Sequence, residues 1–368
     1  MLFNKQLDAA EIALSVSYSL NILGSIQWMI RQSVEVESQM TAVERVLEYC
    51  HLEQESPSHT NYRPNANWPS CGEINFKNVS FRYSNDSPFV LKNLTLTIYS
   101  GEKIGIVGRT GAGKSSFIQT LFRMAEPTGQ IYIDNVDIFQ LGLYDLRRRI
   151  SIIPQDPVLF TGTVRYNLDP FGDYSDIEIW KALEEVQLKS FVEKNMSNSL
   201  KSLVSESGSN LSVGQKQLIC LARAILKKSK ILVIDEATAN VDNATDEFIQ
   251  NSIREKFKHC TVLTIAHRLR TVVDNDRIMV MNAGELVEFD SPYSLLENPT
   301  SYLTDLVRQT GAAEFDHLRG LAKLAYLRTS VDQQTKQYVD NKNIQSEHFD
   351  NSNGEETEQL LKSDHLVV

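Results

Sequence analysis

The sequence has few cysteines, and their spacing indicates neither a disulfide framework nor a zinc site. The four cysteines (Cys50, Cys71, Cys220 and Cys260) are far apart and form no C-x-x-C pair. Such cysteines are typical of reduced thiols in a cytosolic domain. The chain also lacks an excess of positive charge, since its formal net charge is −10. We therefore expect no nucleic-acid partner.

Long apolar runs are scarce as well, and one stretch, Ile12 to Ile30, is free of charged residues over a length that could cross a membrane. As a helix it would be about 28 Å long, close to a hydrocarbon core of roughly 30 Å. Its interspersed polar residues favour packing in a bundle or lining a cavity. Arg31 and Trp28 fit a cytosolic flank and an interfacial position. A buried helix of a soluble protein is the alternative, whereas Asp8 and Glu11 disfavour a signal peptide.

The regions around the main domain have their own composition. Helical spacing of apolar residues continues from Arg31 to Cys50, so residues 1–50 are expected to be a transmembrane helix with a cytosolic extension. Residues 51–72 contain Pro57, Pro64 and Pro69 among polar residues, which is typical of an extended linker. Residues 313–368 are expected to be a C-terminal extension that is mostly a disordered acidic tail.

The middle of the chain alternates between strand and helix patterns. Ile74–Phe76, Val79–Phe81 and Leu94–Ile98 alternate with period two, as half-buried strands do. Residues 231–234 and 261–265 are continuous apolar runs of the kind found in buried parallel strands. This alternation predicts an α/β domain with a mostly parallel core sheet.

A phosphate-binding loop is the most specific local motif. Gly108-Arg-Thr-Gly-Ala-Gly-Lys-Ser115 fits G-x-x-x-x-G-K-[ST], between a candidate strand and a candidate helix. Its glycines let backbone N–H groups point at phosphates, and the helix N-terminus adds partial positive charge. Lys114 should reach the β- and γ-phosphates, and Ser115 should ligate Mg²⁺. A glycine-rich turn that binds nothing is the alternative, which both flanks disfavour. The expected ATP-binding residues here are Gly108, Arg109, Thr110, Gly111, Ala112, Gly113, Lys114, Ser115 and Ser116.

Two carboxylates, Asp235 and Glu236, end the apolar run 231–234. Asp235 is suited to hold Mg²⁺, directly or through water. Glu236 can polarise the water that attacks the γ-phosphate. A simple helix cap is the alternative, and the phosphate loop upstream disfavours it.

A second helix start follows Leu211-Ser-Val-Gly-Gln215. Ser212 is the expected N-cap, so this helix N-terminus could also meet an anion. In isolation a well-capped helix would explain the motif equally well. The order of phosphate loop, L-S-x-G-Q and apolar-Asp-Glu, however, resembles the nucleotide-binding domain of ABC transporters.

The other elements of that family are present in order. By this resemblance, Tyr83 stacks on adenine, Gln155 is the Q-loop glutamine that senses Mg²⁺ and the membrane domain, Asp242 belongs to the D-loop, and His267 is the switch histidine at the γ-phosphate. Glu236 and His267 would then be catalytic, and Ser115, Gln155 and Asp235 would hold the metal. The signature residues Leu211, Ser212, Val213, Gly214 and Gln215 would complete the ATP site of a partner domain.

The resemblance also implies a fold and its bounds. It implies a P-loop NTPase of the ABC type over residues 73–312, in which an antiparallel β subdomain and a helical subdomain at 156–210 accompany the core sheet. Val213 in place of the usual glycine resembles the second nucleotide-binding domain of the C subfamily, the multidrug-resistance-associated proteins. So do Arg31-Gln-Ser-Val-Glu-Val-Glu37 and Val43-Glu-Arg-Val-Leu-Glu-Tyr49, which resemble the end of its last transmembrane helix. The chain would then be a C-terminal fragment of such a transporter.

This resemblance implies an ATPase that drives export of organic anions or drug conjugates, with ATP and Mg²⁺ as cofactors. Its partners would be a second nucleotide-binding domain and transmembrane domains, in the plasma membrane with the nucleotide-binding domain on the cytosolic side. Since valine restricts the backbone where glycine is usual, we expect the partner's site completed by Val213 to close less well.

The alternative to an exporter is an ATP-gated channel or a receptor regulator of the same subfamily. A soluble ABC ATPase is disfavoured, because the segment from Lys114 to Leu211 is too short for an inserted coiled coil. The end His365-Leu-Val-Val368 could dock in a PDZ domain, with a plain disordered end as the alternative.

Overall fold

The computed structural model describes residues 9–52, 54–84, 86–196, 198–235, 241–266 and 268–327. Glu236, His267, most of the predicted acidic tail and the C-terminal residues 365–368 lie outside these ranges. The chain divides into two compact units, residues 1–56 and 57–368.

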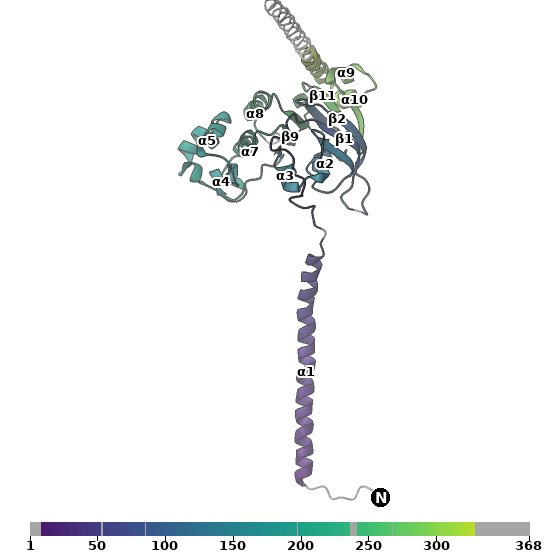
Figure 1. Ribbon diagram of the computed structural model, residues 1–368, viewed down its shortest axis with the longest axis vertical. Helices are drawn as coiled ribbons and strands as arrows, with labels where there is room; N and C mark the ends of the chain where they lie inside the picture. Colours follow the sequence, from purple (N-terminus) through teal and green to yellow (C-terminus); the bar gives the residue numbers. More distant parts are fainter. Residues whose placement is uncertain are drawn as a thin grey trace, which may run out of the picture. The chain divides into compact units, whose positions relative to one another are not determined.

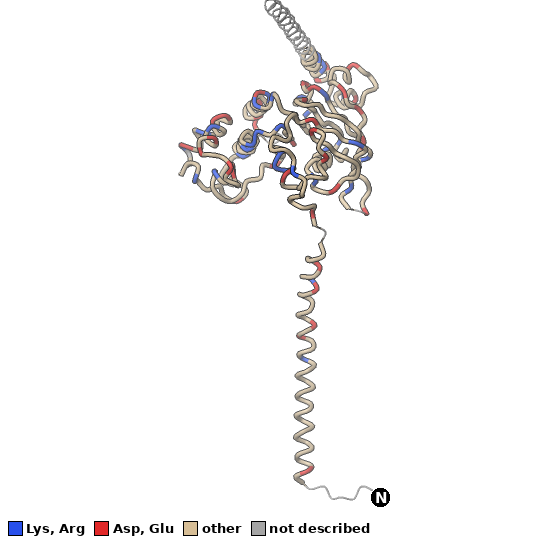
Figure 2. Tube along the Cα trace, viewed as in Figure 1, with Lys and Arg blue, Asp and Glu red and all other residues tan. Residues whose placement is uncertain are grey.

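The first unit is a long helix, α1 (Ala9–Cys50). It is long and apolar enough to cross a membrane by length and composition, and none of its residues is buried. Ser19 Oγ donates to Ser15 O at 2.8 Å, so this hydroxyl is satisfied within the helix itself. Apart from Glu11 near its start, the charged residues of α1 lie in its second half (Figure 2). The expected continuation of the apolar helix to Cys50 is confirmed.

The second unit is built on a six-stranded sheet with the order β12-β11-β3-β10-β9-β6. All neighbours in this sheet pair in parallel except β11 and β12. The predicted mostly parallel core sheet is therefore confirmed. Its strands are β3 (Lys103–Val107), β6 (Ile150–Ile153), β9 (Ile231–Asp235), β10 (Thr261–Ile265), β11 (Arg277–Asn282) and β12 (Glu285–Asp290).

A four-stranded antiparallel sheet with the order β2-β1-β4-β5 lies beside it. Its strands are β1 (Ile74–Phe81), β2 (Leu91–Ile98), β4 (Thr128–Ile133) and β5 (Val136–Asp137). The expectation of separate strands at 74–76 and 79–81 was wrong, because both belong to β1. The register shifts between Phe76 and Val79, where Asn78 has a left-handed φ of 51°. Such a bulge lets one strand continue through a polar interruption.

Helices cover the rest of the second unit. Figure 1 shows α2 beside β1 and β2, whereas α4, α5, α7 and α8 form a group on the other side. The helices α5 and α6 are separated at Gln187, whose φ is 58°. The helices are α2 (Lys114–Leu121), α3 (Leu143–Arg147), α4 (Val164–Leu168), α5 (Asp176–Glu185), α6 (Lys189–Asn195), α7 (Val213–Lys227), α8 (Asn243–Lys256), α9 (Pro292–Glu297) and α10 (Tyr302–Arg308), with a short strand pair of β7 (Gly162–Thr163) and β8 (Leu203–Val204).

Both flanks of the predicted domain contribute to the second unit. Residues 57–72 pack on it: Trp68 is buried, and its Nε1 donates to Ile133 O at 2.9 Å. The N–H of Leu143 donates to Pro57 O at 3.1 Å. Residues 312–327 are helical, and Leu318 and Ala322 are buried on one face of this segment. The start of the expected tail is therefore structured, because apolar residues four apart give it a face to bury.

Candidate nucleotide-binding site

The parallel register brings four strand ends to one edge of the core sheet. Ile265 of β10 pairs with Ile106 of β3 on one side and with Asp235 of β9 on the other. Ile153 of β6 pairs with Ile234 of β9. The phosphate loop after β3, the carboxylate of Asp235 and the Q-loop after β6 therefore leave the sheet at the same edge. The carboxyl edge of a parallel sheet is where open α/β proteins bind their ligands.

The phosphate loop ends in a helix start that no side chain caps. Gly113 is the N-cap of α2, with a left-handed φ of 100° and no capping hydrogen bond from a side chain. Its position also requires glycine, since a Cβ there would lie 2.8 Å from Leu91 Cδ2. A Cβ on Gly108 would collide with the carbonyl oxygen of Met281. The first N–H groups of α2 are thus left for an anion, as the prediction of a phosphate site requires.

Lys114 lies folded over its own loop. Its side chain is buried, and its Nζ donates to Gly108 O at 2.8 Å and to Arg109 O at 3.3 Å. Burial lowers the pKa of this amine, and the negative charge of Asp235 partly opposes that effect. The structure thus brings together the loop lysine and the strand-end carboxylate that the sequence singled out from distant segments.

Tyr83 lies just beyond the end of β1 and is tied to the start of α2. Its Oη lies 2.9 Å from Ser116 Oγ, and its ring meets Phe81 edge-on with centroids 5.0 Å apart. The tyrosine is nevertheless 55% exposed. A ring that is anchored next to the phosphate loop and still open to solvent can take a base on its face.

The oxygen donors expected for a metal are of the type that Mg²⁺ prefers. Ser115 is exposed in the first turn of α2, Gln155 is exposed in the loop after β6, and Asp235 is partly buried at the end of β9. Hydroxyl, amide and carboxylate oxygens are hard ligands. The donor set therefore fits this metal, although each ligand assignment stays a prediction.

The signature motif starts α7, as the sequence predicted from Ser212. Ser212 Oγ accepts from the N–H of Gln215 at 3.2 Å, and Gln215 Oε1 accepts from the N–H of Ser212 at 2.9 Å, which makes a capping box. Val213 is the first helical residue and is 45% exposed. Its φ is not in the left-handed region, so the expected backbone restriction of valine does not arise in this conformation.

The signature belongs to a different hydrophobic cluster from the phosphate loop. Leu211 and Ile219 pack among the helical segments, whereas Ala112 and Phe117 pack with the antiparallel sheet. The register that gathers the phosphate loop, Asp235 and the Q-loop does not include α7.

The D-loop residue Asp242 is the N-cap of α8 and is exposed. Its Oδ2 accepts from the N–H of Thr245 at 3.0 Å, and this hydrogen bond holds the pKa of the carboxyl below its ordinary value. A Cβ on Gly214 would lie 3.4 Å from Thr245 Cγ2, so the signature and the start of α8 are in contact range. Glu236 and His267, the predicted catalytic pair, lie outside the described residues.

Sequence patterns missed a set of buried or partly buried polar side chains that contact the Q-loop, namely Asn167, Gln217 and Arg223. Asn167 and Gln217 are each 1% exposed. The one available signal was a glutamine on the apolar face of a helix, where it has to find a partner.

Comparison with known proteins agrees with this geometry. The family model described as ABC transporter matches residues 91–239. The chain is 56% identical over 324 residues to ATP-binding cassette sub-family C member 4 of Mus musculus, covering 88% of this chain and 24% of that protein. It is 51% identical over 323 residues to a protein of Drosophila melanogaster named as a probable multidrug resistance-associated protein, covering 86% of this chain and 23% of that protein. A solved bacterial Atm1-family ABC exporter with ATP bound has a TM-score of 0.64 at 32% identity and covers 82% of this chain and 52% of its own. The chain thus spans about a quarter of the length of the curated relatives it matches.

Proposed function

The chain belongs to the ABC transporter family, and within it to the C subfamily; on this basis we propose that it binds and hydrolyses ATP to drive export of organic anions or drug conjugates across a membrane. The observation that carries the proposal is the shared sheet edge, where the phosphate loop, Asp235 and the Q-loop meet. The substrate class rests on the kind of relatives the chain has, which include a multidrug resistance-associated protein.

The residues of this chain divide the work on ATP. Tyr83 stacks on the adenine, and the uncapped N–H groups at the start of α2 hold the phosphates. The amine of Lys114 leaves its two loop carbonyls for the β- and γ-phosphate oxygens, which are stronger acceptors. Mg²⁺, held by Ser115, Gln155 and Asp235, would neutralise charge that develops on the phosphates. Glu236 polarises the attacking water, and His267 contacts the γ-phosphate.

The proposal includes a second nucleotide-binding domain. The signature at the start of α7 packs in another cluster from the phosphate loop of the same chain, so it serves an ATP held by the partner. The partner's signature in turn completes the site described here. With Glu236 present, this chain supplies the catalytic glutamate of the hydrolytic site.

The proposal places α1 in a membrane as one helix of a transmembrane domain. Its length, its apolar first half and the lack of buried residues support this placement. The bundle in which it would pack has to include transmembrane helices beyond α1. The nucleotide-binding domain then lies on the cytosolic side of the plasma membrane, where ATP is available.

The first test of this proposal is the Mg²⁺ dependence of ATP binding. We expect the chain, purified in detergent micelles, to bind ATP more tightly when Mg²⁺ is added. Asp235→Asn should remove most of that gain and leave Mg²⁺-free binding nearly unchanged, because the amide is a weaker and uncharged metal ligand. Isothermal titration calorimetry with and without Mg²⁺ measures both quantities.

The matched control is Asp290→Asn, which changes a strand-end carboxylate of the same sheet on β12, away from the site edge. It should bind ATP as the unchanged chain does. The proposal would be contradicted if the chain bound no ATP, or if its ATP affinity depended neither on Mg²⁺ nor on Asp235.

A further inference from the structure

The backbone of the Q-loop, residues 154–160, is held at three separate points by polar side chains, of which Asn167 and Gln217 are buried and Arg223 is partly buried. Gln217 Nε2 donates to Pro154 O at 3.0 Å, directly before Gln155. Arg223 Nη1 donates to Val158 O at 2.8 Å. Asn167 bonds both backbone groups of Phe160: its Oδ1 accepts from the N–H at 2.9 Å and its Nδ2 donates to the oxygen at 2.8 Å. The loop therefore displays exposed side chains on a backbone that is fixed from behind.

The third holding point is itself fixed to α7. Arg223 Nε donates to Asn167 O at 2.6 Å, and its Nη2 donates to Asn167 Oδ1 at 3.1 Å. One arginine of α7 thus contacts both the loop and the residue that clamps the loop's end. A buried hydrogen-bonded network of this kind rigidifies the groups it joins.

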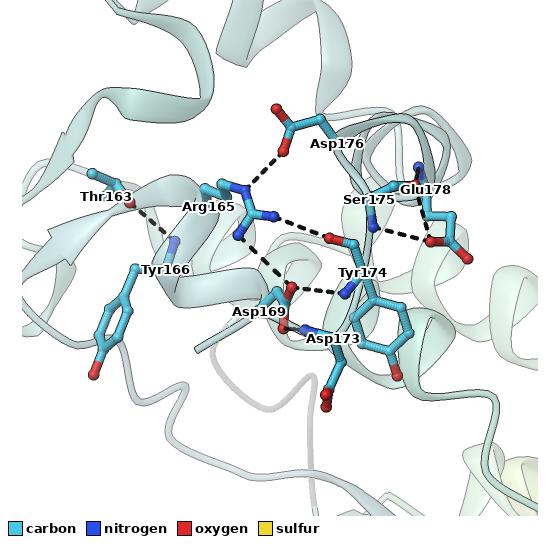
Figure 3. Close-up of polar contacts among 9 residues, drawn as sticks. All are labelled: Thr163, Arg165, Tyr166, Asp169, Asp173, Tyr174, Ser175, Asp176 and Glu178. Atoms are coloured by element: carbon cyan, nitrogen blue, oxygen red, sulfur yellow. Dashed lines mark hydrogen bonds and ion pairs between the residues drawn. The ribbon is translucent and has the colours of Figure 1, made fainter. Parts of the chain in front are cut away.

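The helix that carries Asn167 rests on rigid support. Figure 3 shows the end of α4, where Asp169 accepts from the N–H groups of Asp173 and Tyr174, each at 3.0 Å. Arg165 adds an ion pair with Asp169 at 3.8 Å and a hydrogen bond to Asp176 Oδ1 at 2.7 Å. The side chain of Asp169 is only 1% exposed, so these buried polar contacts hold the end of α4 in place.

Two of the three holding residues, Gln217 and Arg223, belong to α7, whose first turn is the signature. Gln217 lies two residues beyond Gln215 of the capping box. The sequence therefore places the group that contacts the partner's nucleotide and the groups that hold the Q-loop on one helix. An α-helix moves as one body over this length. A displacement of its first turn would therefore also displace Gln217 and its hydrogen bond to Pro154 O.

We propose that Gln217 and Arg223 are positioning residues that hold Gln155 at the metal, so that metal binding in this domain depends on the helix that carries the signature. The inference rests on the proposed function, since it takes Gln155 as a ligand of Mg²⁺ bound with ATP. It assigns α7 a role in this domain's own site in addition to its role in the partner's. Side chains that orient a metal ligand without touching the metal commonly control its affinity.

The experiment compares Gln217→Met with the unchanged full chain. Methionine has a similar volume and no donor, so it removes the bond to Pro154 with little change in packing. We expect the Mg²⁺ concentration that gives half of the gain in ATP affinity to rise about tenfold, with Mg²⁺-free ATP affinity unchanged. Hydrogen exchange of the amides in residues 155–160 should become faster. Gln155→Ala should reproduce the shift in Mg²⁺ requirement, and Arg223→Lys should give a smaller one.

The matched control is Lys227→Met. Lys227 also lies on α7, is partly buried and donates to two carbonyl oxygens, Ile150 O at 2.6 Å and Arg147 O at 3.1 Å, but neither belongs to the Q-loop. It should lower thermal stability without moving the Mg²⁺ requirement. An unchanged Mg²⁺ requirement in Gln217→Met, beside a raised one in Gln155→Ala, would overturn the inference and leave the proposed function standing. If the unchanged chain did not bind ATP, this result would instead contradict the proposed function itself.

Discussion

Lys114→Ala is expected to lower the affinity of the chain for ATP by about a hundredfold. The buried amine is held over the loop by Gly108 O and Arg109 O, and by the proposal it exchanges these for two phosphate oxygens. Hydrogen bonds to charged groups contribute about 1.5–3 kcal/mol each. Because the amine gives up its two carbonyl bonds on binding, only the extra strength of the phosphate bonds is lost; at about 1.5 kcal/mol for each of the two bonds this is about 3 kcal/mol, or about a hundredfold in affinity. Calorimetric titration of ATP into the chain measures the change.

Lys103→Ala is the matched control for this substitution. Lys103 starts β3, whereas the phosphate loop follows the end of that strand. Burial lowers the pKa of Lys103 as it does for Lys114, and its Nζ also donates to backbone carbonyls, those of Gly101, Lys258 and Cys260. We expect lower thermal stability and unchanged ATP affinity. If Lys114→Ala bound ATP as tightly as Lys103→Ala does, this result would mean that Lys114 does not contact the phosphates.

Glu236→Gln is expected to reduce ATP turnover by about a thousandfold while ATP binding survives. Glutamine keeps the shape of the side chain but cannot accept the proton of the attacking water, and loss of a general base typically costs 10² to 10⁴ in rate. Turnover should be measured with the full chain and a matching first nucleotide-binding domain, since the proposed site is shared between two domains.

Glu255→Gln serves as the control for this change, because it makes the same chemical substitution at an exposed position of α8. Its turnover should equal that of the unchanged chain. Equal and near-zero rates for the unchanged chain and Glu236→Gln, with ATP still bound, would favour a domain that uses ATP binding as a switch.

The phosphate loop and the capping of α7 could be predicted because both depend on neighbours in the sequence. The pattern that ends in Lys114 needs a strand before it and a helix after it, and both are there. Ser212 and Gln215 satisfy each other's backbone groups within one turn. Local chemistry of this kind does not depend on how the chain packs.

Other features depend on partners that are distant in the sequence. Trp68 is in a proline-rich stretch that is typical of a linker, yet the backbone oxygen of Ile133 gives its indole N–H a buried partner. The three points that hold the Q-loop bring together residues 154–160, Asn167 and α7. No periodicity or short motif indicates such contacts, because each polar side chain is satisfied only once the strands and helices have packed.

The expectation for Val213 shows a different limit of sequence reasoning. Glycine is usual at this position, and a restricted backbone was the inferred consequence of valine. In the structure Val213 is the first residue of α7, outside the left-handed φ region where glycine is favoured. Any effect of valine on the partner's site would then come from its exposed side chain rather than from its backbone.

The most direct test of the account is ATP turnover measured while a matching first nucleotide-binding domain is titrated into the full chain. The account predicts a rate near background for the chain alone, because each proposed site needs the phosphate loop of one domain and the signature of another. The rate should rise with the added domain, reach a plateau and disappear in Glu236→Gln. Full turnover without the second domain, or a titration that leaves the rate flat while both proteins bind ATP, would contradict the claim that two domains share each site.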